Sequence, residues 1–298
     1  MKHIKLSLFF LSFFVTLFAQ KQTNSTERIY LSGRGADDMV QWDFQCTDGA
    51  NSGKWTKIGV PSCWELQGFG TYQYGMRWYG KAFPDGVANE KGMYKYEFNA
   101  PETWRDKQIF IVFEASMTDT EVKINGQKAG DVHQGAFYRF SYDIGRRLKF
   151  GKKNLLEVTV SKESENAGVN LAERRADDWN FGGIFRPDFL EVKPALHIAQ
   201  LTIDAKADGT FNANCYLNRA LESASIKTIV FDNKGNKVGE NSCPVKSATD
   251  WCKIQFSIKN PAQWTAETPN RYTAQVSLIA GNGTCLLYTS PSPRDMVD

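Results

Sequence analysis

Apolar and polar residues alternate with a period of two along most of the 298-residue chain. This alternation is typical of β-strands that have one face in a core. Residues 91–100 and 153–162 alternate in this way, and residues 105–116 contain a continuous apolar run, as expected for a strand buried on both faces. After the N-terminal apolar run, no helical pattern is longer than two turns. The sequence therefore predicts an all-β protein.

Turns and breaks divide the predicted strands into two groups. The pair Asn125-Gly126 follows a short alternating run and suits a type I′ hairpin turn. Residues 24–194 have the size of one large sandwich, and after Pro194 short strands recur at roughly the 8–12 residue spacing of a small sandwich. We therefore expect domains over residues 24–194 and 195–283. Residues 284–298, TCLLYTSPSPRDMVD, are interpreted as a non-native tail or a Ser/Pro-rich linker.

The N-terminus has the organisation of a secretory signal peptide. MKHIK is positively charged, LSLFFLSFFVTLF is apolar, and Ala19 precedes a polar stretch, so residues 1–19 are predicted to be removed. No second apolar run of spanning length follows, and we expect no membrane span in the mature chain. The predicted location is outside the bacterial cytoplasm, in the periplasm or the extracellular medium.

Charge and composition exclude several classes of function. A net charge of +3 is too small to indicate a nucleic-acid partner. The three histidines, the absence of a CxxC pair and the absence of a nucleotide-binding glycine motif predict no metal, no cofactor and no Ser-His-Asp triad. The six cysteines leave bridges and free thiols equally open: Cys46 with Cys63, and Cys215 with Cys243 or Cys252.

Candidate binding chemistry lies in the stretch RADDWNFGGIFRPDFLEV, where Asp177 and Asp178 precede Trp179. An ionised aspartate accepts hydrogen bonds from neighbouring sugar hydroxyls, and an indole face covers the apolar side of a sugar ring. Adjacent carboxylates on one loop do not flank a glycosidic bond from two sides, so we assign no catalytic pair. These three residues are predicted to bind substrate, and the alternative is a simple turn.

Five segments resemble, in order, the N-terminal part of glycoside hydrolase family 2, which includes β-galactosidases and β-glucuronidases. They are VPSCWELQGFGTY, GMYKYEFNAPETW, VKINGQKAGDVHQGAFYRFSYDI, DDWNFGGIFRPDFLEV and NPAQWTAETPNRYTAQVSL. The resemblance covers about residues 31–283. It implies a jelly-roll-like, galactose-binding-type sandwich followed by an immunoglobulin-like sandwich.

The resemblance also implies what the chain contributes to catalysis. Family members carry two catalytic glutamates on a C-terminal (β/α)₈ barrel, which this sequence lacks, so no catalytic residue is expected here. The position that matches the family's sugar-contacting aspartate is Asp177. Met76 falls where β-galactosidase-like members carry a second contact, an asparagine, so the sugar is not fixed as galactose.

We therefore expect the non-catalytic N-terminal part of a secreted, exo-acting, retaining β-glycosidase that acts on terminal β-linked sugars. Its expected partners are that sugar and the barrel domain of the same chain, and a homo-oligomer stays open. The alternative is a stand-alone carbohydrate-binding protein of two β-domains. An exposed aromatic groove that includes Trp78, Tyr79 or Trp179 would favour the alternative.

Overall fold

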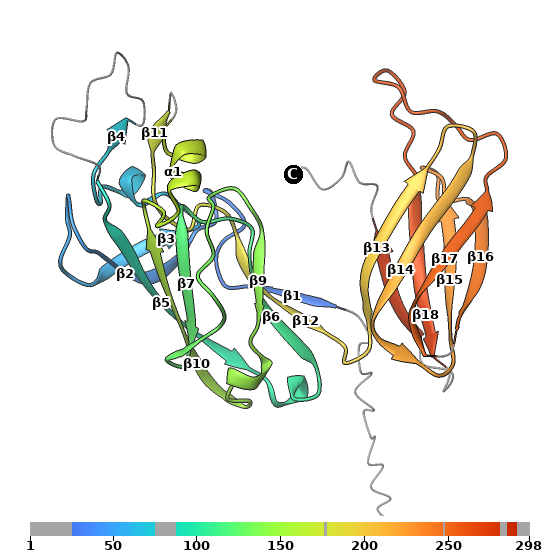
Figure 1. Cartoon of the computed structure of the whole chain (residues 1–298), viewed down its shortest axis with the longest axis horizontal. Coiled ribbons are helices and arrows are strands. Elements are labelled where there is room, and N and C mark those ends of the chain that lie inside the picture. Colours follow the sequence, from blue (N-terminus) through green and yellow to red (C-terminus); the bar gives the residue numbers. More distant parts are fainter. Residues whose placement is uncertain (1–25, 75–87, 176–177, 247, 281–284, 291–298) are drawn as a thin grey trace, which may run out of the picture.

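The computed structural model describes residues 26–74, 88–175, 178–246, 248–280 and 285–290. The predicted signal peptide, Met76, Trp78, Tyr79 and Asp177 lie outside these residues. Almost all of the described regular structure is β-strand, and the strands form two separate groups of sheets (Figure 1). The prediction of an all-β chain is confirmed. No described helix is long and apolar enough to cross a membrane.

The first group is a sandwich of a six-stranded and a four-stranded antiparallel sheet. The larger sheet has the order β3-β2-β5-β10-β7-β8 and the smaller β1-β12-β6-β9. The strands of the larger sheet are β3 (Thr56–Val60), β2 (Val40–Cys46), β5 (Lys91–Ala100), β10 (Lys152–Ser161), β7 (Asp119–Ile124) and β8 (Gln127–Lys128). Those of the smaller sheet are β1 (Glu27–Tyr30), β12 (Asp188–Lys193), β6 (Gln108–Phe113) and β9 (Phe140–Asp143).

The period-two pattern places one face of each central strand in the core. On β10, Leu156, Val158 and Val160 are buried at alternate positions. Val158 is directly opposite Tyr94 of β5 on one side and Val122 of β7 on the other. Their side chains pack with those of the smaller sheet in one continuous apolar cluster. The expected strands over residues 91–100, 105–116 and 153–162 thus correspond to β5, β6 and β10.

The hairpin predicted at Asn125-Gly126 is present. Both residues have positive φ, 52° and 80°, as a type I′ turn requires. The Asn125 side chain also accepts a hydrogen bond from the Leu155 amide (3.1 Å) and donates one to Asn154 (2.9 Å). The turn is therefore fixed both by its backbone and by the neighbouring strand β10.

The second group of sheets packs around its own apolar cluster, which includes Phe211, Ile226 and Val276. Its sheets have the orders β13-β14-β17 and β16-β15-β18-β19. The strands are β13 (Ile198–Ala205), β14 (Thr210–Leu221), β17 (Thr249–Ser257), β16 (Lys237–Val245), β15 (Ala224–Phe231), β18 (Thr273–Ala280) and β19 (Cys285–Ser290). The five cysteines whose side chains are described are free thiols: Cys46, Cys63, Cys215, Cys243 and Cys252.

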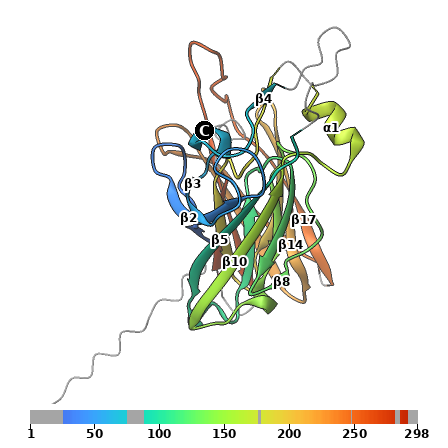
Figure 2. The ribbon, with the colours of Figure 1, turned by 90° about the vertical axis from the view of Figure 1, so that its left-hand side faces the viewer.

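A few short elements lie outside the large sheets. They are the two-stranded ribbon β4 (Gln73–Tyr74) with β11 (Trp179–Asn180), the helix α1 (Ala167–Glu173), and the 3₁₀ turns η1 (Trp64–Gln67), η3 (Glu102–Trp104) and η4 (Gly145–Arg147). Figure 2 shows β4 and α1 at the same end of the first sandwich. Asp178 and Trp179, two of the three predicted substrate-binding residues, belong to this end.

Candidate sugar-binding site

The candidate site is the ribbon formed by β4 and β11. Trp179 pairs with Tyr74, and Asn180 pairs with Gln73. Asp178 and Trp179 are exposed side by side, with Trp179 46% exposed, whereas Asn180 is buried. The alternation of a strand thus directs the indole outward and the amide inward. The structure places two of the three predicted residues at one surface, and Asp177 lies outside the described residues.

Aromatic rings surround Trp179. The Tyr72 ring stacks on the indole with a centroid distance of 4.4 Å and an interplanar angle of 14°. Tyr74 meets the indole edge-on at 5.2 Å, and Phe181 contacts Tyr72 at 5.5 Å. Tyr72 is itself 53% exposed. The ribbon therefore presents flat aromatic surface to solvent beside the carboxylate of Asp178.

The segment that leads from α1 to the ribbon is held by buried and half-buried polar contacts. Arg174 is buried and donates to the carbonyl of Phe181 (2.6 Å), while its own carbonyl accepts from the Asn180 amide group (3.0 Å). Arg175 makes a bidentate pair with Glu163, with both N–O distances 3.0 Å. Because the Glu163 carboxylate is used in this pair, it is not a free catalytic group.

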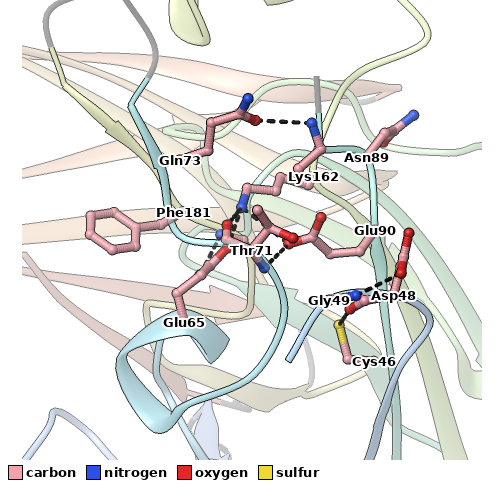
Figure 3. Close-up of polar contacts among 12 residues, drawn as sticks. Cys46, Asp48, Gly49, Glu65, Thr71, Gln73, Asn89, Glu90, Lys162 and Phe181 are labelled. Atoms are coloured by element: carbon pink, nitrogen blue, oxygen red, sulfur yellow. Dashed lines mark hydrogen bonds and ion pairs between the residues drawn. The ribbon is translucent and has the colours of Figure 1, made fainter. Parts of the chain in front are cut away.

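A buried ion cluster lies beneath the ribbon (Figure 3). The ammonium of Lys162 lies 2.7 Å from Glu65 Oε1 and 3.1 Å from Glu90 Oε1, and all three side chains are almost fully buried. Lys162 also donates to the carbonyl of Thr71, and Glu90 accepts from the amide of Thr71 at 2.7 Å. Glu65 Oε2 accepts from the amide of Gly182 at 3.0 Å. The segment that leads into β4 and the segment that follows β11 are thus bonded to one cluster.

Glycines allow the ribbon to pass over a buried tryptophan. A Cβ at Gly182 would lie 2.0 Å from the Trp64 indole, and one at Gly70 would lie 2.7 Å from it and 2.6 Å from Glu90. Such distances are far inside van der Waals contact, so a side chain at either position would move the backbone or the indole. Gly70 is the last residue of the sequence GFG in the first family-like segment, and a glycine is needed there because a side chain would not fit.

The electrostatics of this end are set by burial and by pairing. Burial raises the pKa of the Glu65 carboxyl, and the charge of Lys162 acts in the opposite direction. Burial likewise lowers the pKa of the Arg174 guanidinium, and the carboxylates of Glu163 and Glu65 oppose this. The buried charges of opposite sign therefore support one another, which is the usual condition for charge in a protein interior.

The arrangement is suited to binding. It offers one exposed carboxylate and stacked rings, the combination that holds a sugar by its hydroxyls and its apolar face. Among the described residues, no three His, Cys, Asp or Glu side chains are placed to hold a metal ion.

A hollow of about 600 Å³ lies in the second sandwich, and its lining includes Phe211, Ile258 and Trp264. Two amide side chains at its border donate to backbone carbonyls: Gln263 to Ala207 at 2.7 Å and Asn270 to Gln263 at 2.9 Å. These amides are therefore used to join loops of the sandwich. The lining also includes an exposed carboxylate, Asp204, and an exposed indole, Trp264, but the predicted substrate-binding residues Asp178 and Trp179 lie on the first sandwich. We place the candidate site on the first sandwich.

Several contributors were not selected from the sequence. Tyr72 and Tyr74 are part of the site because a two-residue ribbon brings them against Trp179. Lys162 could have been selected from the sequence. It follows Leu156, Val158 and Val160 at the same two-residue spacing, just past the end of β10, and is buried as they are. A lysine in that phase indicates a buried charge, although the pattern does not identify Glu65 and Glu90 as its partners.

Comparison with known proteins places this architecture in a class, the sugar-binding and sandwich domains of glycosidases. Residues 41–194 match the sugar binding domain of glycosyl hydrolases family 2, and residues 191–289 match a further family 2 domain. The chain belongs to glycoside hydrolase family 2.

Curated relatives and solved structures agree with this assignment. The chain is 26% identical to a beta-galactosidase of Priestia megaterium, over 78% of this chain and 24% of the relative, and 28% identical to one of Lactobacillus delbrueckii subsp. bulgaricus, over 83% and 24%. It thus spans about a quarter of these relatives. The fold resembles a Bacteroides uniformis beta-glucuronidase (TM-score 0.66, 20% identity, 89% of this chain and 32% of that one) and a Bifidobacterium dentium beta-glucuronidase (0.67, 18%, 90% and 48%).

Proposed function

We propose that this chain is the N-terminal, non-catalytic part of a secreted, exo-acting, retaining β-glycosidase of the β-galactosidase-like kind. The parent enzyme hydrolyses terminal β-linked sugars, with both catalytic glutamates on a C-terminal barrel. The chain described here supplies one wall of the sugar site. The observation that carries this proposal is the exposed Asp178–Trp179 pair on a ribbon of stacked aromatic rings.

The chemistry of the contact follows from the two side-chain types. Trp179 covers the C–H face of the terminal sugar, and the neighbouring carboxylates accept hydrogen bonds from adjacent hydroxyls. Asp177, which matches the family's sugar-contacting position, is the principal acceptor in this proposal, and Asp178 is the second. Ionised acceptors make stronger hydrogen bonds than neutral ones, so each aspartate adds orientation as well as affinity.

A second candidate is a stand-alone carbohydrate-binding protein. The exposure of Tyr72 and Trp179 on this chain alone favours it, because a flat aromatic surface can hold a sugar without a barrel. The two candidates differ in affinity and in catalysis. If the chain supplies only one wall of a site that the barrel completes, it binds a monosaccharide weakly by itself. A stand-alone module has its whole binding site and therefore binds the same sugar with its full affinity.

The first experiment measures binding by the chain as it exists, by calorimetry with methyl β-D-galactopyranoside and methyl β-D-glucopyranosiduronate. Trp179→Ala is compared with Trp251→Ala, a matched control on the second sandwich that is 47% exposed and also stacks on a tyrosine, Tyr216. We expect weak binding that Trp179→Ala abolishes and Trp251→Ala leaves unchanged. If Trp179→Ala and Trp251→Ala changed the sugar affinity equally, the sugar site would not be at Trp179.

The second experiment joins the chain to the catalytic barrel of a family 2 enzyme and follows release of 4-nitrophenol from the matching β-glycosides. The chain alone is expected to release none, because the proposal assigns both catalytic glutamates to the barrel. In the joined protein, Asp177→Ala should lower kcat/KM by about 100-fold, a loss of roughly 3 kcal/mol. Hydrolysis by the chain alone would overturn the non-catalytic assignment.

A further inference from the structure

The ribbon beside which the aromatic rings stack is too short to be stable without other contacts. Among the described residues, two pairs join β4 to β11, Trp179 with Tyr74 and Asn180 with Gln73. An isolated two-stranded hairpin is at best marginally stable in water, and this ribbon is shorter than most. Something else must fix the positions of the rings.

The buried cluster contacts the chain just before β4 and just after β11. Lys162 and Glu90 together bond the carbonyl and the amide of Thr71, which immediately precedes Tyr72. Glu65 bonds the amide of Gly182, two residues beyond the end of β11. Figure 3 shows the side chains of Glu65, Glu90 and Lys162 converging from separate segments near Thr71.

Burying these charges has a cost that pairing does not necessarily offset. A buried ion pair is often replaceable by apolar groups of similar volume with no loss of stability, so its presence is weak evidence for a stabilising role. The cluster instead contains two carboxylates and one ammonium, each bonded to the other groups or to the backbone beneath the rings. Its contacts specify where two strands lie.

We propose that Lys162 is a positioning residue for the sugar-binding surface. Its ammonium orients Glu65 and fixes Thr71, and through these contacts it sets the separation and tilt of the Tyr72 and Trp179 rings. The inference rests on the proposed function in one respect only, that the rings bind sugar. Lys162 itself, fully buried beneath them, does not touch the ligand.

The test uses a variant that leaves the net charge of the cluster unchanged. Lys162→Met with Glu65→Leu removes one positive and one negative group together, and with them the bonds to Thr71 and to Gly182. The matched control is Lys107→Met with Glu27→Leu, which removes an ion pair of 2.6 Å in the same sandwich, near β1 and β6. Both are made in the full chain, with and without Trp179→Leu.

The decisive readout is the near-ultraviolet circular dichroism that Trp179 contributes, measured as the difference that Trp179→Leu makes. We expect this contribution to fall by more than half in the Lys162 variant and to stay unchanged in the control. A purely structural role would lower the thermal midpoint and leave the Trp179 contribution as in the wild type. That result would overturn the proposal.

Sugar affinity provides the second readout, with the two methyl glycosides used above. The Lys162 variant should bind about tenfold more weakly, and Trp179→Leu should cost less affinity in that variant than in the wild type, because the effects of coupled residues are not additive. If Trp179→Leu alone leaves the affinity unchanged, the proposed function fails, while the dichroism still decides the role of Lys162.

Should the paired variant not fold, Glu65→Gln takes its place. Glutamine keeps the shape and an acceptor for Gly182 but lacks the charge that orients the ammonium. A reduced Trp179 dichroism in this variant supports the positioning role, and a contribution equal to that of the wild type overturns it.

Discussion

Trp179 stacks on Tyr72 and not on Tyr74, the residue directly opposite it in the ribbon. The contact is therefore diagonal, to a residue two positions before Tyr74 and just outside β4, and it brings the rings to 4.4 Å with planes 14° apart. Long aromatic side chains can reach such diagonal neighbours. By contrast, Trp251 stacks on its direct partner Tyr216 at 6.3 Å. The diagonal contact leaves one continuous aromatic surface on the ribbon.

The closer stack should be energetically coupled. We expect a double-mutant cycle of Tyr72→Leu and Trp179→Leu, measured by urea unfolding of the first sandwich, to give a coupling free energy of about 1 kcal/mol. The same cycle on Tyr216 and Trp251, read from unfolding of the second sandwich, should give less because the rings are farther apart. A larger coupling in the second pair would contradict this ranking.

Gly182 should tolerate no side chain. The Cβ of Gly182→Ala would lie 2.0 Å from Cζ2 of the fully buried Trp64 indole, so the ribbon or the core must shift. We expect a loss of about 3 kcal/mol in the free energy of unfolding, at the upper end of overpacking costs. Gly35→Ala is the control, since nothing lies within 4 Å of its Cβ. Equal unfolding midpoints for the two variants would refute the steric argument.

The sandwich strands were predictable because the alternation that identifies each strand lies within that strand's own residues. β5 and β10 alternate over ten residues, and burial on one face is sufficient to specify such a pattern. The hairpin at Asn125 was predictable for a similar reason, since Asn-Gly is the pair that favours positive φ at both positions. In each case the information is local.

The site was predictable only in part because its evidence is not local. β4 and β11 have two residues each, too few to show a period, and they pair only because the sandwich brings their segments together. Lys162 is recognisable as a charge in the buried phase of β10. Glu65 and Glu90 come from distant segments of the chain, so no spacing rule identifies them as its partners.

Cys46 and Cys63 should react slowly in the folded protein. Burial raises the pKa of Cys46 to about 11 and that of Cys63 to about 12. Since only the thiolate reacts, alkylation by iodoacetamide at pH 8 should be at least about 100-fold slower than for an unfolded cysteine. Peptide mass spectrometry measures this residue by residue, with the urea-unfolded chain as the control. Fast labelling of Cys63 in the folded chain would contradict it.

Asp188 should make the stability of the first sandwich depend on pH. It is fully buried on β12, its carboxyl oxygens have no hydrogen-bond partner that meets normal geometry, and burial raises its pKa to about 7 from 3.8. The Ser32 hydroxyl favours the ionised form of this carboxyl but does not offset the burial. The folded protein therefore keeps this carboxyl protonated between about pH 4 and pH 7, where the unfolded chain ionises it.

The sign of the effect follows from this difference. Stability linked to Asp188 is fully present below pH 3.8 and is lost as the pH rises through about 7, because folding must then bury an ionised carboxylate or keep a proton that the unfolded chain releases. Asp188→Asn removes the titration. At pH 8 the variant should unfold at a higher urea concentration than the wild type, by a few kcal/mol since one pKa unit corresponds to about 1.4 kcal/mol. The difference should shrink steadily toward pH 5. Parallel curves for the two proteins between pH 5 and pH 8 would show that Asp188 does not titrate in this range.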